Sequence, residues 1–289
     1  MIELDTGLQD LKIQHPEWVP WLAVVHAVLI EATDSKWEAI VPPSTETSDK
    51  VPLLANATLH LETSLVRQML AQIIRIACRD GTAKMATLAP ATEAELDILK
   101  LFKASLHHDS DQMKAIAAAL GADSDAFQAV SALLPVPFLQ ACNRHWAGFI
   151  REGWMEGYCP VCGAWPAFAE VRGIERSRYL RCGRCGGAWQ AHCLFCPYCG
   201  MTDHNELPSL VPENSGSNSA IDACKRCLGY VKTFTKLQGS QPANVMVDDL
   251  ASVDFDVAAA EHGYKRPPGT GYFLNVTVTE NDAARSRFA

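Results

Sequence analysis

The sequence lacks a long hydrophobic run. Its longest apolar stretch, Trp18 to Ile30, has 13 residues and contains Pro20 and His26. A helix needs about 20 apolar residues to cross the hydrocarbon core of a bilayer. The N-terminal residues, Met-Ile-Glu-Leu-Asp, also lack the positive charge that opens a secretory signal. We therefore expect a cytoplasmic protein with no targeting segment and no membrane contact.

The sequence also lacks the short motifs of several enzyme classes. It contains no phosphate-binding loop, no Gly-x-Gly-x-x-Gly and no Gly-x-Ser-x-Gly. These absences argue against the nucleotide-binding and hydrolase sites that such motifs build. We predict that the chain is not an enzyme and has no catalytic residues.

A strong positive charge is missing as well. Counting Lys and Arg against Asp and Glu gives −8 for residues 1–158, +3 for 159–236 and −3 for 237–289, which together make the formal net charge of −8. A nucleic-acid-binding domain is usually basic over a whole face. The charge distribution therefore argues against a nucleic-acid-binding protein. Of the three hypotheses for function considered in this section, it is the least favoured.

What the sequence does contain is a cysteine-rich stretch between Cys159 and Cys227. Eight of its cysteines form four Cys-x-x-Cys pairs. Two residues between cysteines let one tight turn aim both sulfurs at a single point, and two such turns make a tetrahedral cage for zinc or iron. The thiols of a cytosolic protein stay reduced, so metal binding is favoured over disulfides. Four pairs thus predict two metal sites.

The spacing of the four pairs favours pairing by neighbours. The loops between successive pairs contain 19, 10 and 24 residues, and each long loop can form a small β-hairpin between two metal-binding turns. A hairpin is indicated by alternation in 168–172 and 177–181, with a turn near Gly173. A cross-braced arrangement, with the first pair joined to the third, remains the alternative. The predicted ligands are Cys159, Cys162, Cys182 and Cys185 for site one, and Cys196, Cys199, Cys224 and Cys227 for site two.

Glycine follows the second cysteine in three of the pairs, as Gly163, Gly186 and Gly200. Glycine tolerates the left-handed backbone conformation that such a turn needs there. Cys193 stands outside the four pairs, although it lies three residues before Cys196 and next to His192. We interpret Cys193 as an extra thiol near site two, with a structural role favoured over a redox or ligand role.

A cage of four cysteines is closed, whereas catalytic zinc keeps one coordination position open for water. Zinc would be structural in such a site, and iron in the same cage would be rubredoxin-like and capable of one-electron transfer. The predicted cofactors are two Fe or Zn ions, one per site. A rubredoxin-like iron redox protein is therefore the second hypothesis for function.

Residues 1–156 show helical periodicity. The pair Thr92 and Glu95 fits a capping box for a helix over 96–106. Gly121 fits a helix end, and Asp123 or Ser124 fits the start of the next helix. Apolar residues recur at helical spacing at Trp21, Val24, Val25, Val28, Leu29, Leu61, Leu65, Met69, Ile73 and Ile76.

The predicted fold class is α+β and multidomain. An all-α N-terminal domain, residues 1–156, precedes two small rubredoxin-like or zinc-ribbon-like modules with four cysteines each. The first module spans residues 157–190 and the second spans 191–238. A C-terminal tail segment spans residues 239–289.

Several motifs of the cysteine region stand together: Cys159-Pro-Val-Cys162-Gly, Arg178-Tyr-Leu-Arg-Cys182-x-x-Cys185, Trp189 and Cys196-x-x-Cys199. The tail contains Asp248-Asp-Leu-Ala-Ser252 and Glu261-His-Gly-Tyr264. Through these motifs the chain resembles the FdhE family of formate dehydrogenase accessory proteins. Cys193 departs from the family pattern, in which a basic residue is usual at that position.

The resemblance implies a cytoplasmic protein that binds the catalytic subunit of a formate dehydrogenase during maturation, before export. It also implies iron in the sites of four cysteines, with zinc as the alternative. A homodimer is left open. We expect Arg178 and Tyr179 to be exposed partner contacts, against the alternative that Tyr179 packs in the hairpin. The nucleic-acid hypothesis rests on Arg172, Arg176, Arg178, Arg181, Arg184, Lys225 and Arg226.

Overall fold

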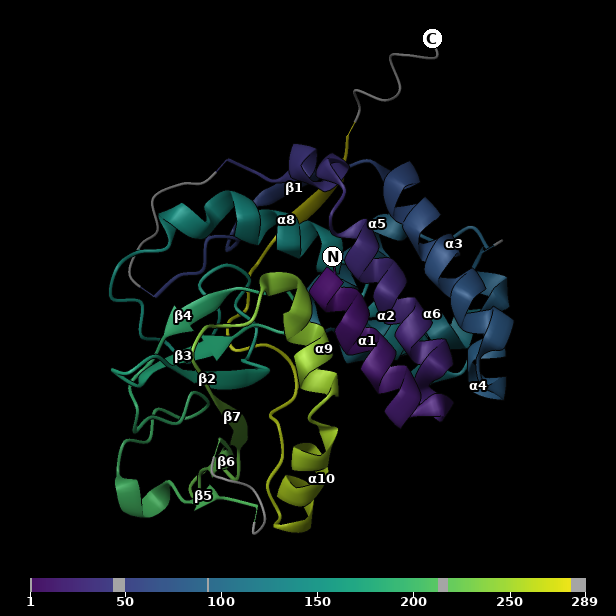
Figure 1. Cartoon of the computed structure of the whole chain (residues 1–289). Helices are drawn as coiled ribbons and strands as arrows, with labels where there is room; N and C mark the ends of the chain where they lie inside the picture. The colour runs from purple at the N-terminus through teal and green to yellow at the C-terminus, as the bar shows by residue number, and fades with distance from the viewer. Residues whose placement is uncertain (1, 44–49, 93, 213–217, 282–289) are drawn as a thin grey trace. The chain divides into compact units, whose positions relative to one another are not determined.

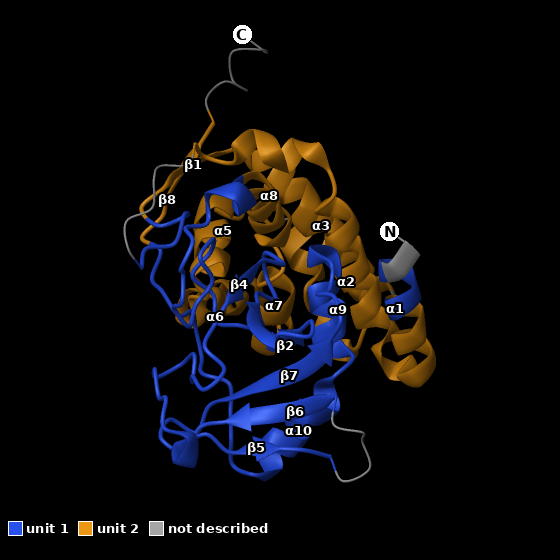
Figure 2. Ribbon diagram, turned by 60° about the vertical axis from the view of Figure 1, so that its left-hand side comes forward, with its two compact units in different colours: residues 1–7, 44–55, 146–274 blue, residues 8–43, 56–145, 275–289 orange. Residues whose placement is uncertain are grey.

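The computed structural model describes residues 2–43, 50–92, 94–212 and 218–281 (Figure 1). The chain forms two compact units, each assembled from segments that are distant in sequence (Figure 2). Unit 1 comprises residues 1–7, 44–55 and 146–274, and unit 2 comprises residues 8–43, 56–145 and 275–289. Helix α1, Ile2–Gln14, contributes residues to both.

Unit 2 is built from helices, as the periodicity predicts. Its core contains the fully buried rings of Phe102 and Phe138, which meet edge to face with centroids 6.0 Å apart. Burying one such side chain stabilises the fold by about 1.5–3 kcal/mol. The helices are α2 (Val19–Glu31), α3 (Thr63–Asp80), α4 (Ala83–Ala86), α5 (Ile98–His107), α6 (Ser110–Leu120), α7 (Ser124–Ser131) and α8 (Val136–Trp146). Short 3-10 turns lie at Pro16–Trp18, Ser35–Ile40 and Ala89–Thr92.

The helix boundaries correct one predicted cap and confirm two others. Thr92 does not cap the helix after it, because α5 begins later and Asp97 accepts a hydrogen bond from the Lys100 amide at 2.9 Å. Gly121 ends α6 in the left-handed conformation, and Asp123 caps α7, both as predicted. The carboxylate of an aspartate directly before a helix accepts hydrogen bonds from the free amides of the first turn. Asp97 is in that position and Thr92 is not, so Asp97 caps α5.

Unit 2 also contains a strand pair that helical periodicity missed. Strand β1, Thr58–Leu61, pairs in parallel with β8, Thr277–Glu280. In β1 the two leucines are buried and the alternate residues are exposed. The C-terminal part of the predicted tail segment thus returns to the helical unit, and its final residues, 282–289, lie outside the described part of the chain.

Unit 1 is organised around a single six-stranded sheet with the order β4-β3-β2-β7-β6-β5. The first cysteine module supplies an antiparallel half and the second module supplies another. The two halves join where β2 pairs in parallel with β7, in register from Phe168 opposite Lys232 to Arg172 opposite Lys236. The strands are β2 (Phe168–Arg172), β3 (Ser177–Arg181), β4 (Ala188–Gln190), β5 (Ser209–Leu210), β6 (Ser219–Ala223) and β7 (Tyr230–Lys236).

The predicted hairpin over 168–181 is confirmed as β2 and β3, with Gly173 in the left-handed conformation at its turn. Two short helices pack on the sheet. Helix α9, Val245–Leu250, places Val245 against Phe168 and Phe234, and α10, Val253–Glu261, places Ala259 against the β6–β7 pair. Further 3-10 turns in unit 1 lie at Ala147–Phe149, His204–Glu206 and Pro242–Asn244.

The predicted fold class is confirmed: a helical N-terminal region is followed by sheet regions that carry two clusters of four cysteines. Both predicted modules contribute strands to one sheet, and the proposed module boundaries at 157, 191 and 239 stay a prediction. Among the described helices, none combines the length and apolar character needed to cross a bilayer.

Candidate metal centres

All four Cys-x-x-Cys turns share one backbone pattern. The amide of the residue after the second cysteine donates to the carbonyl of the first, with N–O distances of 2.9 Å at Gly163, 3.0 Å at Gly186, 2.9 Å at Gly200 and 2.9 Å at Leu228. That residue is left-handed in every case, with φ between 56° and 73°, as predicted for the three glycines. We call each turn a knuckle. Leu228, with φ of 56°, shows that the geometry is imposed even without glycine.

A second hydrogen bond closes each knuckle. The amide of the first cysteine donates to the carbonyl five residues later, as in Cys159 to Ala164 at 2.9 Å and Cys196 to Met201 at 2.8 Å. The same bond joins Cys182 to Gly187 at 3.0 Å and Cys224 to Gly229 at 2.9 Å. The sulfurs of each pair are therefore held on one side of a rigid turn.

The structure gathers the cysteines by neighbouring pairs. The first two knuckles bring together Cys159, Cys162, Cys182 and Cys185, and the last two bring together Cys196, Cys199, Cys224 and Cys227. Within each group all four Sγ atoms lie within 4.8 Å of one another. The cross-braced alternative is wrong for the described structure, because the first knuckle meets the second and not the third.

Site one is fully buried. All four of its cysteines have 0% exposure. The Sγ atoms of Cys159 and Cys185 are 3.4 Å apart, and those of Cys162 and Cys182 are 3.5 Å apart. Metal–sulfur bonds of about 2.3 Å in a tetrahedron place sulfurs about 3.8 Å apart. The four donors therefore suit a zinc or iron ion with little rearrangement.

Polar groups around site one favour negative charge on sulfur. The amides of Cys185 and Gly187 each lie 3.4 Å from a cysteine sulfur. Arg184, inside the second knuckle, is 9% exposed and lies near all four thiols. Burial lowers the pKa of Arg184, and the neighbouring sulfurs oppose that change. A guanidinium there would offset part of the −2 charge that four thiolates and a divalent metal carry.

Burial also influences the protonation of the site-one thiols. It raises the pKa of the Cys159 and Cys185 thiols well above the ordinary value. Hydrogen bonds from the other three sulfurs lower the pKa of Cys182. A metal ion must therefore displace protons from site one when it binds.

Site two lies nearer to solvent. Cys196 and Cys224 are buried, with 4% and 1% exposure, whereas Cys199 and Cys227 are partly exposed. The Sγ pairs Cys196–Cys227 and Cys199–Cys224 are each 3.6 Å apart, so the donor set suits the same ions. The two sites differ in access to solvent rather than in ligand type.

Cys193 is exposed and lies outside both groups of four. It lines a cavity of about 130 Å³ together with Cys196 and Cys224 of site two. Arg178 and Asp222 line the same cavity. Cys193 thus lies beside site two, and its role there stays a prediction.

The expectation that Arg178 is exposed is wrong. Its side chain is 3% exposed, and one terminal nitrogen donates to the carbonyls of His192 at 3.2 Å and Phe195 at 2.9 Å. Its other terminal nitrogen lies 3.5 Å from Asp222. Arg178 therefore holds the loop before the third knuckle and is not available to a partner. Tyr179 is half-buried and stacks with the Arg172 guanidinium, 4.2 Å from the ring centre.

Burial also removes much of the basic patch behind the nucleic-acid hypothesis. Arg181 is 2% exposed and donates to Glu170 at 3.0 Å. Arg172 shares the same fully buried carboxylate, and Arg178 and Arg184 are buried as well. These arginine side chains are buried or paired with a buried carboxylate, so few of the seven predicted positions can contact a phosphate backbone.

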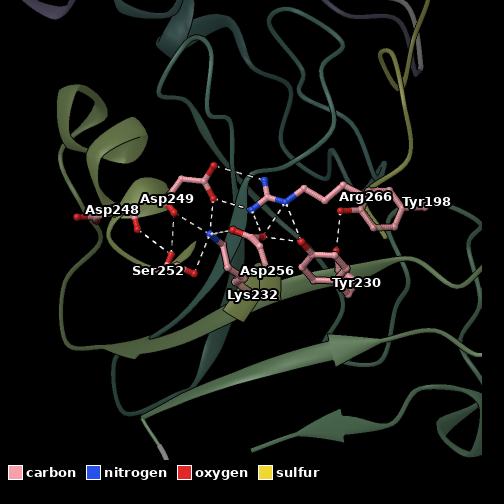
Figure 3. Close-up of polar contacts among 8 residues, drawn as sticks. All are labelled: Tyr198, Tyr230, Lys232, Asp248, Asp249, Ser252, Asp256 and Arg266. Carbon is pink, nitrogen blue, oxygen red and sulfur yellow. Dashed lines mark hydrogen bonds and ion pairs between the residues drawn. The ribbon is translucent and has the colours of Figure 1, made fainter. Parts of the chain in front are cut away.

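Sequence reasoning missed the polar network that fastens the tail segment to the sheet (Figure 3). Lys232, fully buried on β7, donates to the Asp249 carbonyl at 2.7 Å and the Asp256 carboxylate at 2.9 Å. Arg266 pairs with Asp249 at 2.7 Å and with Asp256 at 2.8 Å. Tyr230 donates to Asp256 at 2.5 Å. The tail motif thus supplies partners for a buried lysine.

Two features of the sequence could have revealed this network. Lys232 alternates with Tyr230 and Phe234, which places a charge among rings on one face of the strand. A buried ammonium needs carboxylate or carbonyl partners, and the tail contains an aspartate pair. The network also reaches site two, because Tyr198 of the third knuckle donates to the Tyr230 carbonyl at 2.9 Å.

Comparisons with known proteins agree with this geometry. Residues 192–274 match the family described as FdhE, C-terminal domain. A Protein FdhE homolog from Pseudomonas aeruginosa is 34% identical over 152 residues, covering 46% of this chain and 49% of the relative. One from Aquifex aeolicus is 31% identical over 119 residues, covering 40% and 41%. The chain thus spans about half the length of these relatives in the aligned regions.

The fold has a counterpart among solved structures. The crystal structure of the FdhE protein from Pseudomonas aeruginosa matches with a TM-score of 0.60 and 22% identity, covering 93% of both chains. This likeness supports the fold over nearly the whole chain. Residues 192–274 thus match the FdhE C-terminal domain, and the resemblance to FdhE proteins predicted from the cysteine and tail motifs is confirmed.

Proposed function

We propose that the chain is a non-enzymatic accessory protein that binds the catalytic subunit of a formate dehydrogenase in the cytoplasm, during maturation of that enzyme. The support is the FdhE resemblance, which extends from the knuckles to the tail motif. The observation that carries the proposal is the pair of closed four-cysteine groups joined through one sheet. Such groups stabilise a binding surface and leave a metal no open position for substrate.

The metals in this proposal act on the fold. Zinc or iron bound by four thiolates would tie the two knuckles of each site together and supply folding energy to a small module. Hydrogen bonds among the chain's own residues supply the other connections between its segments. Glu170 accepts hydrogen bonds from Arg181 and from the Ser240 amide, so the first module and the tail segment are joined beneath the sheet.

The exposed end of the sheet offers a contact surface for the client. Ile174, at the β2–β3 turn, is 95% exposed, and Leu237, after β7, is 88% exposed. The β2–β7 register and the hydrogen bond from the Gly173 amide to the Lys236 carbonyl, at 3.3 Å, bring the two positions to the same end. Two exposed aliphatic side chains beside the ends of paired strands suit an apolar patch of a partner protein. This pair replaces Arg178 as the proposed contact.

Co-purification tests the proposed function. Tagged protein should retain the formate dehydrogenase catalytic subunit from cells that make both. An Ile174→Asp and Leu237→Asp double variant should lose at least about 90% of the retained subunit while keeping its metal, because charge at the contact opposes burial. Val257→Asp, which changes an exposed apolar residue on α10, is the matched control and should retain the subunit. Failure of the unaltered chain to retain the subunit would contradict the proposal.

A rubredoxin-like redox role is the second candidate. The observation that favours it is the environment of site one, where backbone amides and the Arg184 side chain lie close to buried sulfurs. Such contacts tune the potential of iron bound by cysteines. Anaerobic purification followed by absorption spectroscopy decides between the metals, because zinc is colourless. A zinc-only protein that supports maturation would remove the redox candidate.

A further inference from the structure

The segment between β4 and the third knuckle carries an exposed thiol beside site two. Cys193 is exposed, and it lines the cavity of about 130 Å³ that Cys196 and Cys224 also line. Cys199 and Cys227, the other two sulfurs of the site, do not line this cavity. Cys193 therefore lines the same cavity as two of the four predicted ligands.

Arg178 fixes the position of that thiol. Its guanidinium donates to the carbonyl before Cys193, that of His192, and to the Phe195 carbonyl two residues after it. The loop is thus held on both sides of Cys193. The Nε atom of Arg178 is buried and has no hydrogen-bond partner among the described residues, and Arg178 lines the cavity. Arg178 therefore also places a positive charge at the cavity, which suits an anionic oxygen such as that of a sulfenate.

We propose that Cys193 is an oxidation site for hydrogen peroxide, and that its oxidation opens site two. The inference rests on the proposed metal occupancy of that site. The exposure of Cys193 and the cavity that it shares with two ligands are both needed. The exposed thiol meets the oxidant first, and the shared cavity lets a ligand sulfur reach the oxidised product.

The chemistry balances in two steps. The Cys193 thiolate attacks one peroxide oxygen, the O–O bond breaks, and hydroxide leaves and takes up a proton, so that a sulfenic acid and water are formed. The Cys196 or Cys224 thiolate then attacks the sulfenic sulfur. An S–S bond forms, the S–O bond breaks, and the second oxygen leaves as water after protonation. Two thiols lose two electrons in total, and one peroxide is reduced to two waters.

The consequence is loss of one ligand from site two. A metal left with three thiolates is bound more weakly, and small metal modules depend on their ligands for stability. Site one should keep its metal, because its four sulfurs are fully buried and Cys193 is not grouped with its four cysteines. Oxidation should therefore weaken metal binding at site two and leave metal binding at site one unchanged.

The test uses the full chain with its metal bound. Metal content is measured first, hydrogen peroxide is added, and released metal is followed with a colorimetric indicator. The unaltered protein should release one metal ion per chain, and Cys193→Ser should release it at least about tenfold more slowly, because it lacks the exposed thiolate. Cys78→Ser, which changes another free cysteine that is only partly buried, should behave like the unaltered protein.

Peptide mapping of the oxidised protein gives a second, independent result. A disulfide between Cys193 and either Cys196 or Cys224 supports the inference. Equal release rates for Cys193→Ser and the unaltered chain would overturn it, and so would disulfides that omit Cys193. Absence of metal from site two before peroxide is added would instead contradict the proposed function, and the mapping would still decide whether the disulfide forms.

Discussion

The residue after each second cysteine adopts the left-handed conformation that closes its knuckle. Gly186 and Gly200 share the left-handed conformation, with φ of 73° and 72°. Their surroundings differ. A Cβ atom at Gly186 would lie 2.4 Å from the Pro242 carbonyl oxygen, whereas at Gly200 it would meet none of the described atoms within 4 Å. Both positions therefore need a residue that tolerates the left-handed conformation. The position of Gly186 in the second knuckle also lacks room for a Cβ atom.

Replacing these glycines by alanine should separate the two requirements. Gly200→Ala should lower the free energy of unfolding by about 1 kcal/mol, the cost of the left-handed conformation alone. Gly186→Ala should lower it by at least about 3 kcal/mol, because the Pro242 backbone must also move. Thermal unfolding of the metal-loaded variants measures both. Equal losses would show that the close approach to Pro242 is unimportant.

At the scale of elements, the tail segment is fastened to β7 by charge. Burial favours the neutral form of Asp256, but the Arg266 guanidinium, the Tyr230 hydroxyl and the Lys232 ammonium outweigh it and hold the pKa below its ordinary value of 3.8. A carboxyl whose pKa is lower in the folded state stabilises the fold above its unfolded pKa. That stabilisation disappears as the pH falls through the folded value.

Asp256→Asn should therefore have a pH-dependent effect. At pH 7 the variant should be less stable by about 3 kcal/mol, because it leaves the buried Lys232 ammonium without one of its charged partners. The difference from the unaltered chain should shrink as the pH falls from about 4 through the lowered folded pKa, because over that range the carboxyl of the unaltered chain becomes protonated. Denaturant unfolding at several pH values gives the comparison. A difference that stays constant with pH would contradict the assigned charge on Asp256.

The elements also show what a sequence can and cannot predict. The knuckles and the β2–β3 hairpin were predictable, because spacing and alternation are local signals. The joining of β2 to β7 was not, since it depends on residues that lie far apart in the chain, such as Phe168 and Phe234. For the same reason the sequence predicts an exposed Arg178, whereas the structure buries it. Its partners, Phe195 and Asp222, approach it only when the sheet is complete.

At the scale of the whole molecule, the two sites should differ in lability. Site one has four sulfurs with 0% exposure, whereas two sulfurs of site two are partly exposed. A chelator reaches exposed ligands more easily, and thiols must take up protons as metal leaves. We therefore expect metal release in two phases, with site two emptied first.

A chelation experiment measures these phases directly. The fast phase should account for one metal ion per chain and be at least about tenfold faster than the slow phase, in keeping with the difference in ligand access. Cys196→Ser should abolish the fast phase and leave the slow one. A single phase for both metals would show that the burial of site one does not protect its ion.

The central claim is that the four knuckles form two independent sites by neighbouring pairs. Elemental analysis of purified full-length protein tests it most directly, with one cysteine of each knuckle changed to serine in turn. The account predicts two metal ions per chain in the unaltered protein, and one in each of Cys159→Ser, Cys182→Ser, Cys196→Ser and Cys224→Ser, with the surviving ion assigned by its release rate. A metal-free unaltered protein, or loss of the site-two ion in Cys159→Ser while the site-one ion stays bound, would contradict it.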